Sequence, residues 1–200
     1  IPHIAAHVRL LRTVDKDENV VVACLEANTK SWPAWRAAHP DNARRIRAIV
    51  QQVSHAVPGP DIRVALTAHS GGGSLIFGYL NGGDAIAGNI VRIAWLDAVY
   101  AYDDASHHGD KLLAWLKGDP HRNLVVISYN DANVKFNGKN IVSPTGGTFY
   151  RSHKMSERLE KDVQLTRTAW GPFEKYVGMN GQIHLLLNTN PEKRILHTVL

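Results

Sequence analysis

The chain has almost no cysteine. Its 200 residues include a single one, Cys24, which excludes an internal disulfide framework. Because Cys24 lies in the apolar run 20–25, we expect it to be a small buried residue. With neither a disulfide pattern nor a targeting signal, the sequence leaves the cellular compartment open.

Long apolar segments are also missing. No run approaches the ~18 consecutive apolar residues of a membrane span, and the N-terminus lacks the charged and then apolar pattern of a signal peptide. The net charge is +5, and the basic residues are scattered apart from the cluster 44–47, which we interpret as a solvated helix face. We therefore expect one globular domain over residues 1–200, with no membrane span and no nucleic-acid partner.

Short apolar runs rich in β-branched residues predict buried strands. They alternate with segments of helical spacing, and such alternation is typical of a mainly parallel, doubly wound α/β sheet with helices on both faces. The predicted strands are 19–25, 62–67, 89–96, 123–128 and 182–187, and the predicted helices are 4–11, 41–56, 72–80, 111–117 and 152–168. The glycine-rich stretch 133–148 is interpreted as an excursion over the C-terminal edge of the sheet, where such folds carry function.

The second of these strands leads through Ala68-His69-Ser70-Gly71-Gly72 into a helix. This turn resembles the nucleophile elbow of the α/β-hydrolase family, in which a strained serine stands above the sheet within the pattern G-x-S-x-G. Gly72 matches the second glycine, whereas Ala68 stands in place of the first. A phosphate-binding turn is the alternative, but the turn lacks a lysine after its glycines and does not match G-x-G-x-x-G.

The resemblance covers roughly residues 4–198 and implies a catalytic triad in the chain order serine, acid, histidine. It places the acid after the strand 123–128, where Asp131 stands, and the histidine after the strand 182–187, where His197 stands. Asp97, at the end of the strand 89–96, is the alternative acid. His184 and His69 are weaker candidates for the base, since one lies inside a strand and the other should point away from the serine.

A serine hydrolase also needs backbone donors for its oxyanion. The resemblance implies one from Gly71 and a second from a loop before the first helix of the family. If 4–11 is that helix, the loop precedes Ile1, so we expect the natural polypeptide to extend beyond both Ile1 and Leu200. The alternative source of the second donor is the segment 27–29.

Three aromatic residues follow strand ends and are candidates for the substrate cleft: Trp32, Tyr100 and Tyr102. The cluster around His107 and His108 is interpreted as a solvated loop rather than a metal site, because adjacent histidines point in different directions. The leading hypothesis is a serine hydrolase that needs no cofactor and no metal. It would cleave small-molecule carboxylic esters through an acyl-enzyme on Ser70. The alternatives are an amidase or peptidase with the same triad, and a catalytically silent binding domain.

Overall fold

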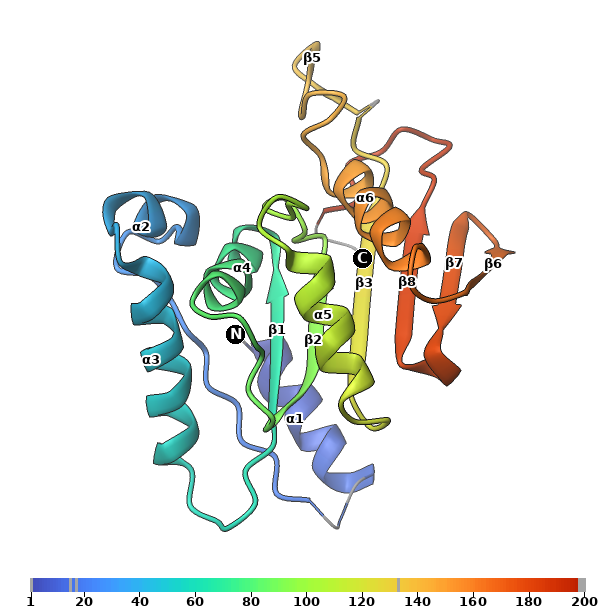
Figure 1. Cartoon of the computed structure of the whole chain (residues 1–200). Coiled ribbons are helices and arrows are strands. Elements are labelled where there is room, and N and C mark those ends of the chain that lie inside the picture. Colours follow the sequence, from blue (N-terminus) through green and yellow to red (C-terminus); the bar gives the residue numbers. More distant parts are fainter. Residues whose placement is uncertain (1, 15, 17, 133, 198–200) are drawn as a thin grey trace.

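A computed structural model describes residues 2–14, 16, 18–132 and 134–197, and it contains a mixed six-stranded sheet (Figure 1). The order of the strands across this sheet is β1-β2-β3-β8-β7-β6. Their bounds are β1 (Val64–His69), β2 (Ile90–Leu96), β3 (Asn123–Tyr129), β6 (Leu165–Trp170), β7 (Phe173–Gly178) and β8 (Ile183–Asn188). The α/β class and the mainly parallel sheet are therefore confirmed.

Four of the predicted strands form the parallel half of the sheet. The pairs β1–β2, β2–β3 and β3–β8 are all parallel. Their ends are in register, with His69 opposite Leu96 and Tyr129 opposite Asn188. Residues that directly follow these strands are consequently brought to one edge of the sheet.

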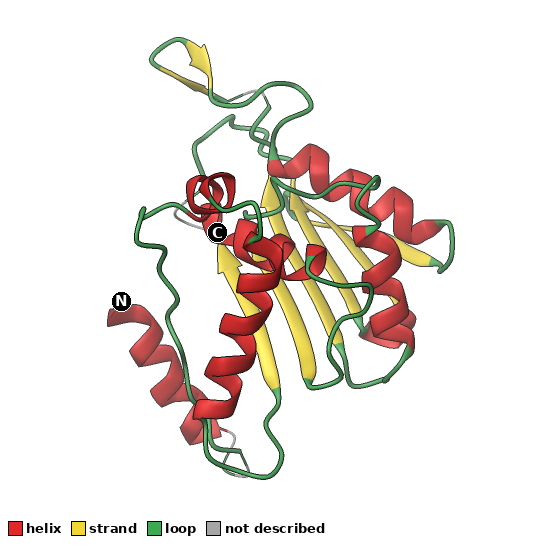
Figure 2. Ribbon diagram, turned by 60° about the vertical axis from the view of Figure 1, so that its left-hand side comes forward, coloured by secondary structure: helices red, strands yellow, loops and turns green. Residues whose placement is uncertain are grey.

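Helices flank this sheet unevenly. They are α1 (Pro2–Val14), α2 (Trp32–Ala38), α3 (Asn42–Ala56), α4 (Gly73–Asn81), α5 (His108–Lys117) and α6 (Thr148–Glu160). Figures 1 and 2 show α4, α5 and α6 lying across the strands. Beneath them, the side chains of Leu124, Val126 and Leu185 are fully buried, whereas the alternate residues Val125 and Leu186 are only half-buried. On the other side of the sheet lies only α1 among the described helices, and its side chains are mostly exposed, so the second face is covered much less than the first.

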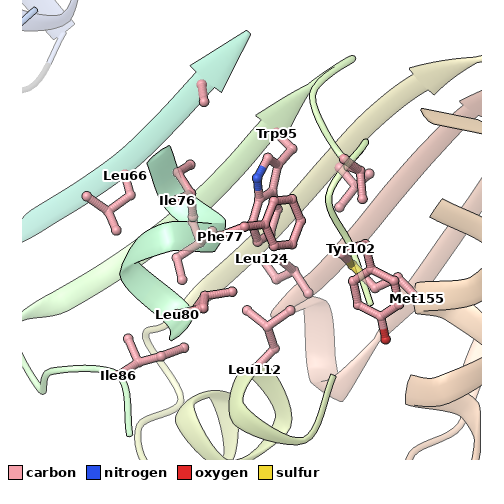
Figure 3. Packing of buried hydrophobic residues seen from close by; sticks show 14 of the residues in the cluster. Leu66, Ile76, Phe77, Leu80, Ile86, Trp95, Tyr102, Leu112, Leu124 and Met155 are labelled. Carbon is pink, nitrogen blue, oxygen red and sulfur yellow. The ribbon is translucent and has the colours of Figure 1, made fainter. Parts of the chain in front are cut away.

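The core lies between the sheet and these helices (Figure 3). Phe77 from α4 stacks on Trp95 from β2 with ring centroids 4.9 Å apart. Leu112 from α5 and Met155 from α6 extend the same cluster. This apolar layer packs the helices that follow β1 and β3 against the sheet, and it thereby fixes the ends of these strands.

The prediction of a strand at 19–25 is wrong. All seven residues are described, yet they form no strand and do not join the sheet, and Val21 and Val22 are exposed. Cys24 is exposed as well, which corrects its assignment to the core. β-branched composition makes a strand only where a neighbouring strand accepts and donates the backbone hydrogen bonds.

The segment after residue 160 also departs from the prediction. The helix expected over 152–168 is α6, which begins at Thr148 and ends at Glu160. The residues that follow form β6, which pairs in antiparallel fashion with β7, and β7 pairs in the same way with β8. The stretch 133–148 holds a two-stranded hairpin of β4 (Lys135–Phe136) and β5 (Lys139–Asn140), which projects away from the sheet (Figure 2).

Candidate active site

Ser70 occupies a strained turn directly after β1. It is the first residue of the short 3-10 helix η1 (Ser70–Gly72), and its φ is +54°. A left-handed backbone costs a non-glycine residue roughly 1–2 kcal/mol, so this conformation requires support from its surroundings. Gly73 supplies part of it, because any Cβ there would overlap the carbonyl oxygen of Ala98. The turn therefore has the backbone strain expected of a nucleophile elbow.

Ala68 fits this turn despite replacing the first glycine of the usual pattern. A Cβ built at Gly72 would lie 3.6 Å from the Cβ of Ala68, which is an ordinary van der Waals separation. With glycine at position 72, the contact is looser still. The extra methyl group of Ala68 is therefore accommodated without moving the strand or the helix.

His197 reaches the serine from the segment after β8. Its Nε2 lies 2.7 Å from Oγ of Ser70, within hydrogen-bond distance. His69 donates from its own Nε2 to the carbonyl oxygen of His197 at 2.7 Å, and the two rings lie 4.7 Å apart. His69 therefore does not act on the serine itself, and its contact ties the residue before the serine to the loop of the predicted base.

The loop that carries His197 is itself held in place by Asn190. The side-chain amide of Asn190 donates to the carbonyl oxygens of Asn130 and Arg194 at 2.9 Å each. Its side-chain oxygen accepts from the amide nitrogen of Arg194 at 3.0 Å. The loop is thus fastened both to itself and to the end of β3.

Asp97, and not Asp131, is the carboxylate on His197. Nδ1 of His197 hydrogen-bonds Oδ2 of Asp97, whose side chain is fully buried. Asp97 directly follows β2, with φ of +47°, and its backbone nitrogen donates to the carbonyl oxygen of Ile127 in β3 at 2.7 Å. The predicted pairing of Asp131 with His197 is therefore wrong, and the alternative acid is the one that makes the contact.

Asp131 lies at the N-terminus of α6, where Thr148 separates it from Asp97. It is buried, and its Oδ2 accepts from the backbone nitrogen of Thr148 at 3.1 Å. Burial raises the pKa of Asp131 to about 6, a shift that the hydrogen bond from Thr148 opposes only in part. The hydroxyl of Thr148 donates to Oδ1 of Asp97, so that Thr148 contacts both carboxylates.

Gly71 holds the position expected of an oxyanion donor. It is the second residue of η1, and the amides in the first turn of a helix have no acceptor within that helix. Pro33 of α2 packs against this point, with its Cδ 3.7 Å from a Cβ built on Gly71. The segment 27–29, which we named as an alternative source of the second donor, ends three residues before α2.

Two of the three predicted cleft aromatics keep an open position. Tyr100 is 36% exposed, and burial together with the nearby charge of Asp97 raises the pKa of its phenol, which stays neutral. Trp32 is half-buried at the start of α2, where its ring meets that of Trp35 edge to face at 5.4 Å. Both side chains therefore remain accessible to a small molecule.

Tyr102, the third of these aromatics, is not accessible. Its side chain is buried in the core (Figure 3), and its hydroxyl donates to Asp104 at 2.7 Å. The prediction of a substrate contact is wrong because the chain turns after Tyr100 and directs Tyr102 beneath α6.

The remaining histidines have other partners. His184 is the second residue of β8, at the end of that strand opposite to the candidate site. His108 is buried, accepts from the backbone nitrogen of Asp103 at 3.1 Å and donates to the side-chain oxygen of Asn81 at 2.8 Å. His107 pairs with Asp110 at the start of α5. The predicted solvated loop is wrong for His108, which is a satisfied core residue.

Comparisons with known proteins gave no relatives. The chain matches no protein-family model, no curated protein and no solved structure. Among the described residues, no helix combines the length and the apolar character needed to cross a membrane. The function therefore has to be argued from the geometry of the site.

Proposed function

We propose that this protein is a serine hydrolase that cleaves carboxylic esters through an acyl-enzyme on Ser70. The observation that carries the proposal is a continuous chain of hydrogen bonds from Ser70 through His197 to Asp97. Three segments far apart in the sequence supply these groups. A purely structural pair of Asp97 and His197 would not explain why the same imidazole also bonds a serine with a strained backbone.

The bonding pattern sets the protonation state of the imidazole. Asp97 is an acceptor when ionised, so Nδ1 of His197 carries the proton and Nε2 is free to accept from the hydroxyl of Ser70. This is the tautomer that a general base needs. A serine hydroxyl is a poor nucleophile until such a base removes its proton.

The proposed reaction has two halves. Oγ of Ser70 attacks the ester carbonyl while Nε2 of His197 takes its proton, and the buried charge of Asp97 stabilises the resulting imidazolium. The amide of Gly71 faces the developing oxyanion. His197 then protonates the departing alcohol, and a water activated by the same nitrogen hydrolyses the acyl-enzyme.

The arrangement of the sheet supports an α/β-hydrolase-like architecture as part of this proposal. The parallel order β1-β2-β3-β8 carries the serine after β1, the acid after β2 and the histidine after β8. Trp32 and Tyr100 are the proposed aromatic contacts of the substrate. Esters are proposed over amides because the leaving alcohol requires less assistance than an amine.

The test is turnover of chromogenic esters by the purified chain. We expect hydrolysis of nitrophenyl acetate, butyrate or octanoate with an initial burst that reports the acyl-enzyme, and slower or no cleavage of peptide nitroanilides. Ser70→Ala should abolish turnover. Ser74→Ala is the matched control, since Oγ of Ser74 accepts from Arg36 at 3.1 Å and the residue lies outside the hydrogen-bonded chain of Ser70, His197 and Asp97. Turnover that survives Ser70→Ala would exclude the proposed nucleophile.

A further inference from the structure

Two buried carboxylates meet at the same edge of the sheet. Asp97 follows β2 and Asp131 follows β3, and the side chain of each is at most 1% exposed. Both oxygens of Asp97 have a donor, one from His197 and one from Thr148. The proposed mechanism uses Asp97 and leaves Asp131 without a role.

Asp131 occupies the place of a helix cap. The residue before α6 is Gly147, which has no side chain to cap the helix. Asp131 fills this position from outside, because its Oδ2 accepts from the amide of Thr148, the first residue of α6. Its carboxylate lies so close that a Cβ on Gly147 would overlap it. A negative charge at a helix N-terminus is favourable because the free amides there carry partial positive charge.

Thr148 connects this cap to the proposed triad. Its amide is held by Asp131, and its hydroxyl donates to Oδ1 of Asp97. The side chain of Thr148 is fully buried, so no water can replace that donor without rearrangement. The orientation of the Asp97 carboxylate therefore depends on where the first turn of α6 lies.

We infer that Asp131 and Thr148 are positioning residues for the proposed triad: Asp131 fixes the first turn of α6, and Thr148 in that turn fixes the carboxylate of Asp97 against His197. The inference rests on the proposed function for its effect on turnover. Its geometric content, the orientation of Asp97, is independent of any substrate. Asp131 has no hydrogen bond to His197 or to the serine, and its hydrogen-bonded link to Asp97 runs through Thr148.

Thr148→Val is the central variant, because it removes the hydroxyl and keeps the shape of the side chain. We expect kcat for a chromogenic ester to fall about 10-fold to 100-fold with KM unchanged, as a hydrogen bond to a charged group is worth about 1.5–3 kcal/mol and each 1.36 kcal/mol is tenfold in rate. Thr148→Ser retains the hydroxyl and should restore kcat. Ser156→Ala is the matched control, since it removes a buried hydroxyl of the same helix that bonds His153 instead.

Asp131 is tested by removing its capacity to accept. Asp131→Leu should lower kcat as much as Thr148→Val, because the first turn of α6 loses its cap. Asp131→Asn keeps an oxygen that can accept from Thr148, so the loss should stay below about 10-fold. Urea unfolding of each variant separates a loss of folded protein from a loss of rate.

Proton NMR reads the orientation of Asp97 without any substrate. The Nδ1 proton of His197, bonded to a buried carboxylate, should give a resonance far downfield of the amides, assigned by its absence in His197→Gln. We expect Thr148→Val and Asp131→Leu to broaden or displace this resonance, and Thr148→Ser and Ser156→Ala to leave it in place.

The two readouts keep the inference and the proposed function separate. A resonance that responds to Thr148→Val in a protein without esterase activity would support the positioning role and contradict the proposed function. An active wild type in which Thr148→Val and Asp131→Leu change neither kcat nor the resonance would overturn the inference. A wild type without the resonance would overturn it as well, since the contact to be positioned would not exist.

Discussion

Asp97→Asn is the change to which the proposed mechanism is most sensitive. The side chain keeps its shape, but an amide nitrogen placed at Oδ2 would face Nδ1 of His197 with a donor. The imidazole would then carry its proton on Nε2, which lies 2.7 Å from Oγ of Ser70 and could no longer accept from it. By analogy with the serine-protease triad, we expect kcat to fall on the order of 10⁴-fold, or about 5 kcal/mol of transition-state stabilisation.

The assay is the pre-steady-state burst and the steady rate with one nitrophenyl ester, with enzyme concentration set by folded protein. Asp131→Asn is the matched control, because it removes the other buried carboxylate at the same edge of the sheet. It should cost less than about 10-fold, since its oxygen still accepts from Thr148. A larger loss for Asp131→Asn than for Asp97→Asn would refute the assignment of the acid.

Three further predictions concern stability. Burial lowers the pKa of His108 from 6.5 to about 4, so its neutral form stabilises the fold fully above pH 6.5. As the pH falls from 6.5 to 4, the unfolded state takes up a proton that the folded state does not, and the free energy of unfolding decreases by about 3 kcal/mol. In urea unfolding at pH 7.5, 5.5 and 4.5, the free energy of unfolding of His108→Gln should depend less on pH than that of the wild type. An equal dependence on pH in the two proteins would contradict this prediction. Gly147→Ala should lower the free energy of unfolding by about 1–3 kcal/mol, because the added Cβ would overlap Asp131. Gly88→Ala is the control and should leave it unchanged, since a Cβ there meets nothing closer than 3.8 Å. Ser70→Gly should be about 1 kcal/mol more stable than Ser70→Ala, because only glycine adopts the backbone of residue 70 without strain; equal thermal midpoints would exclude that strain.

The parallel half of the sheet was predictable because its strands are buried and apolar. The predicted 62–67, 89–96, 123–128 and 182–187 correspond to β1, β2, β3 and β8 within two residues at each end. Burial imposes a composition that can be read directly from the sequence. The position of Ser70 followed from the same signal, since the elbow begins where β1 ends.

The antiparallel pair β6 and β7 carries a weaker signal. Along β6, every residue after Leu165 is exposed, so Thr166, Arg167 and Thr168 show no apolar alternation. Its polar composition instead predicts a continuation of the preceding helix, as in the range 152–168. Gly171-Pro172 between the two strands was the available turn signal, with Gly171 at φ of +55°.

The acid could not be chosen from the sequence for a geometric reason. β2 and β3 are parallel neighbours, so the residues that follow them arrive at the same edge, and either carboxylate could have met His197. Two structural features decide between them: the left-handed backbone of Asp97 and the capture of Asp131 by α6. Neither a backbone angle nor a helix terminus 17 residues away is encoded in the local pattern.

Labelling with a fluorophosphonate tests the nucleophile most directly, because the probe reacts only with a serine that a neighbouring base activates. The purified chain is treated with the probe, digested and analysed by mass spectrometry, beside Ser70→Ala and Ser74→Ala. We expect a single adduct on Ser70 in the wild type and in Ser74→Ala, and none in Ser70→Ala. Absence of an adduct on the folded wild-type protein, or an adduct that persists in Ser70→Ala, would contradict it.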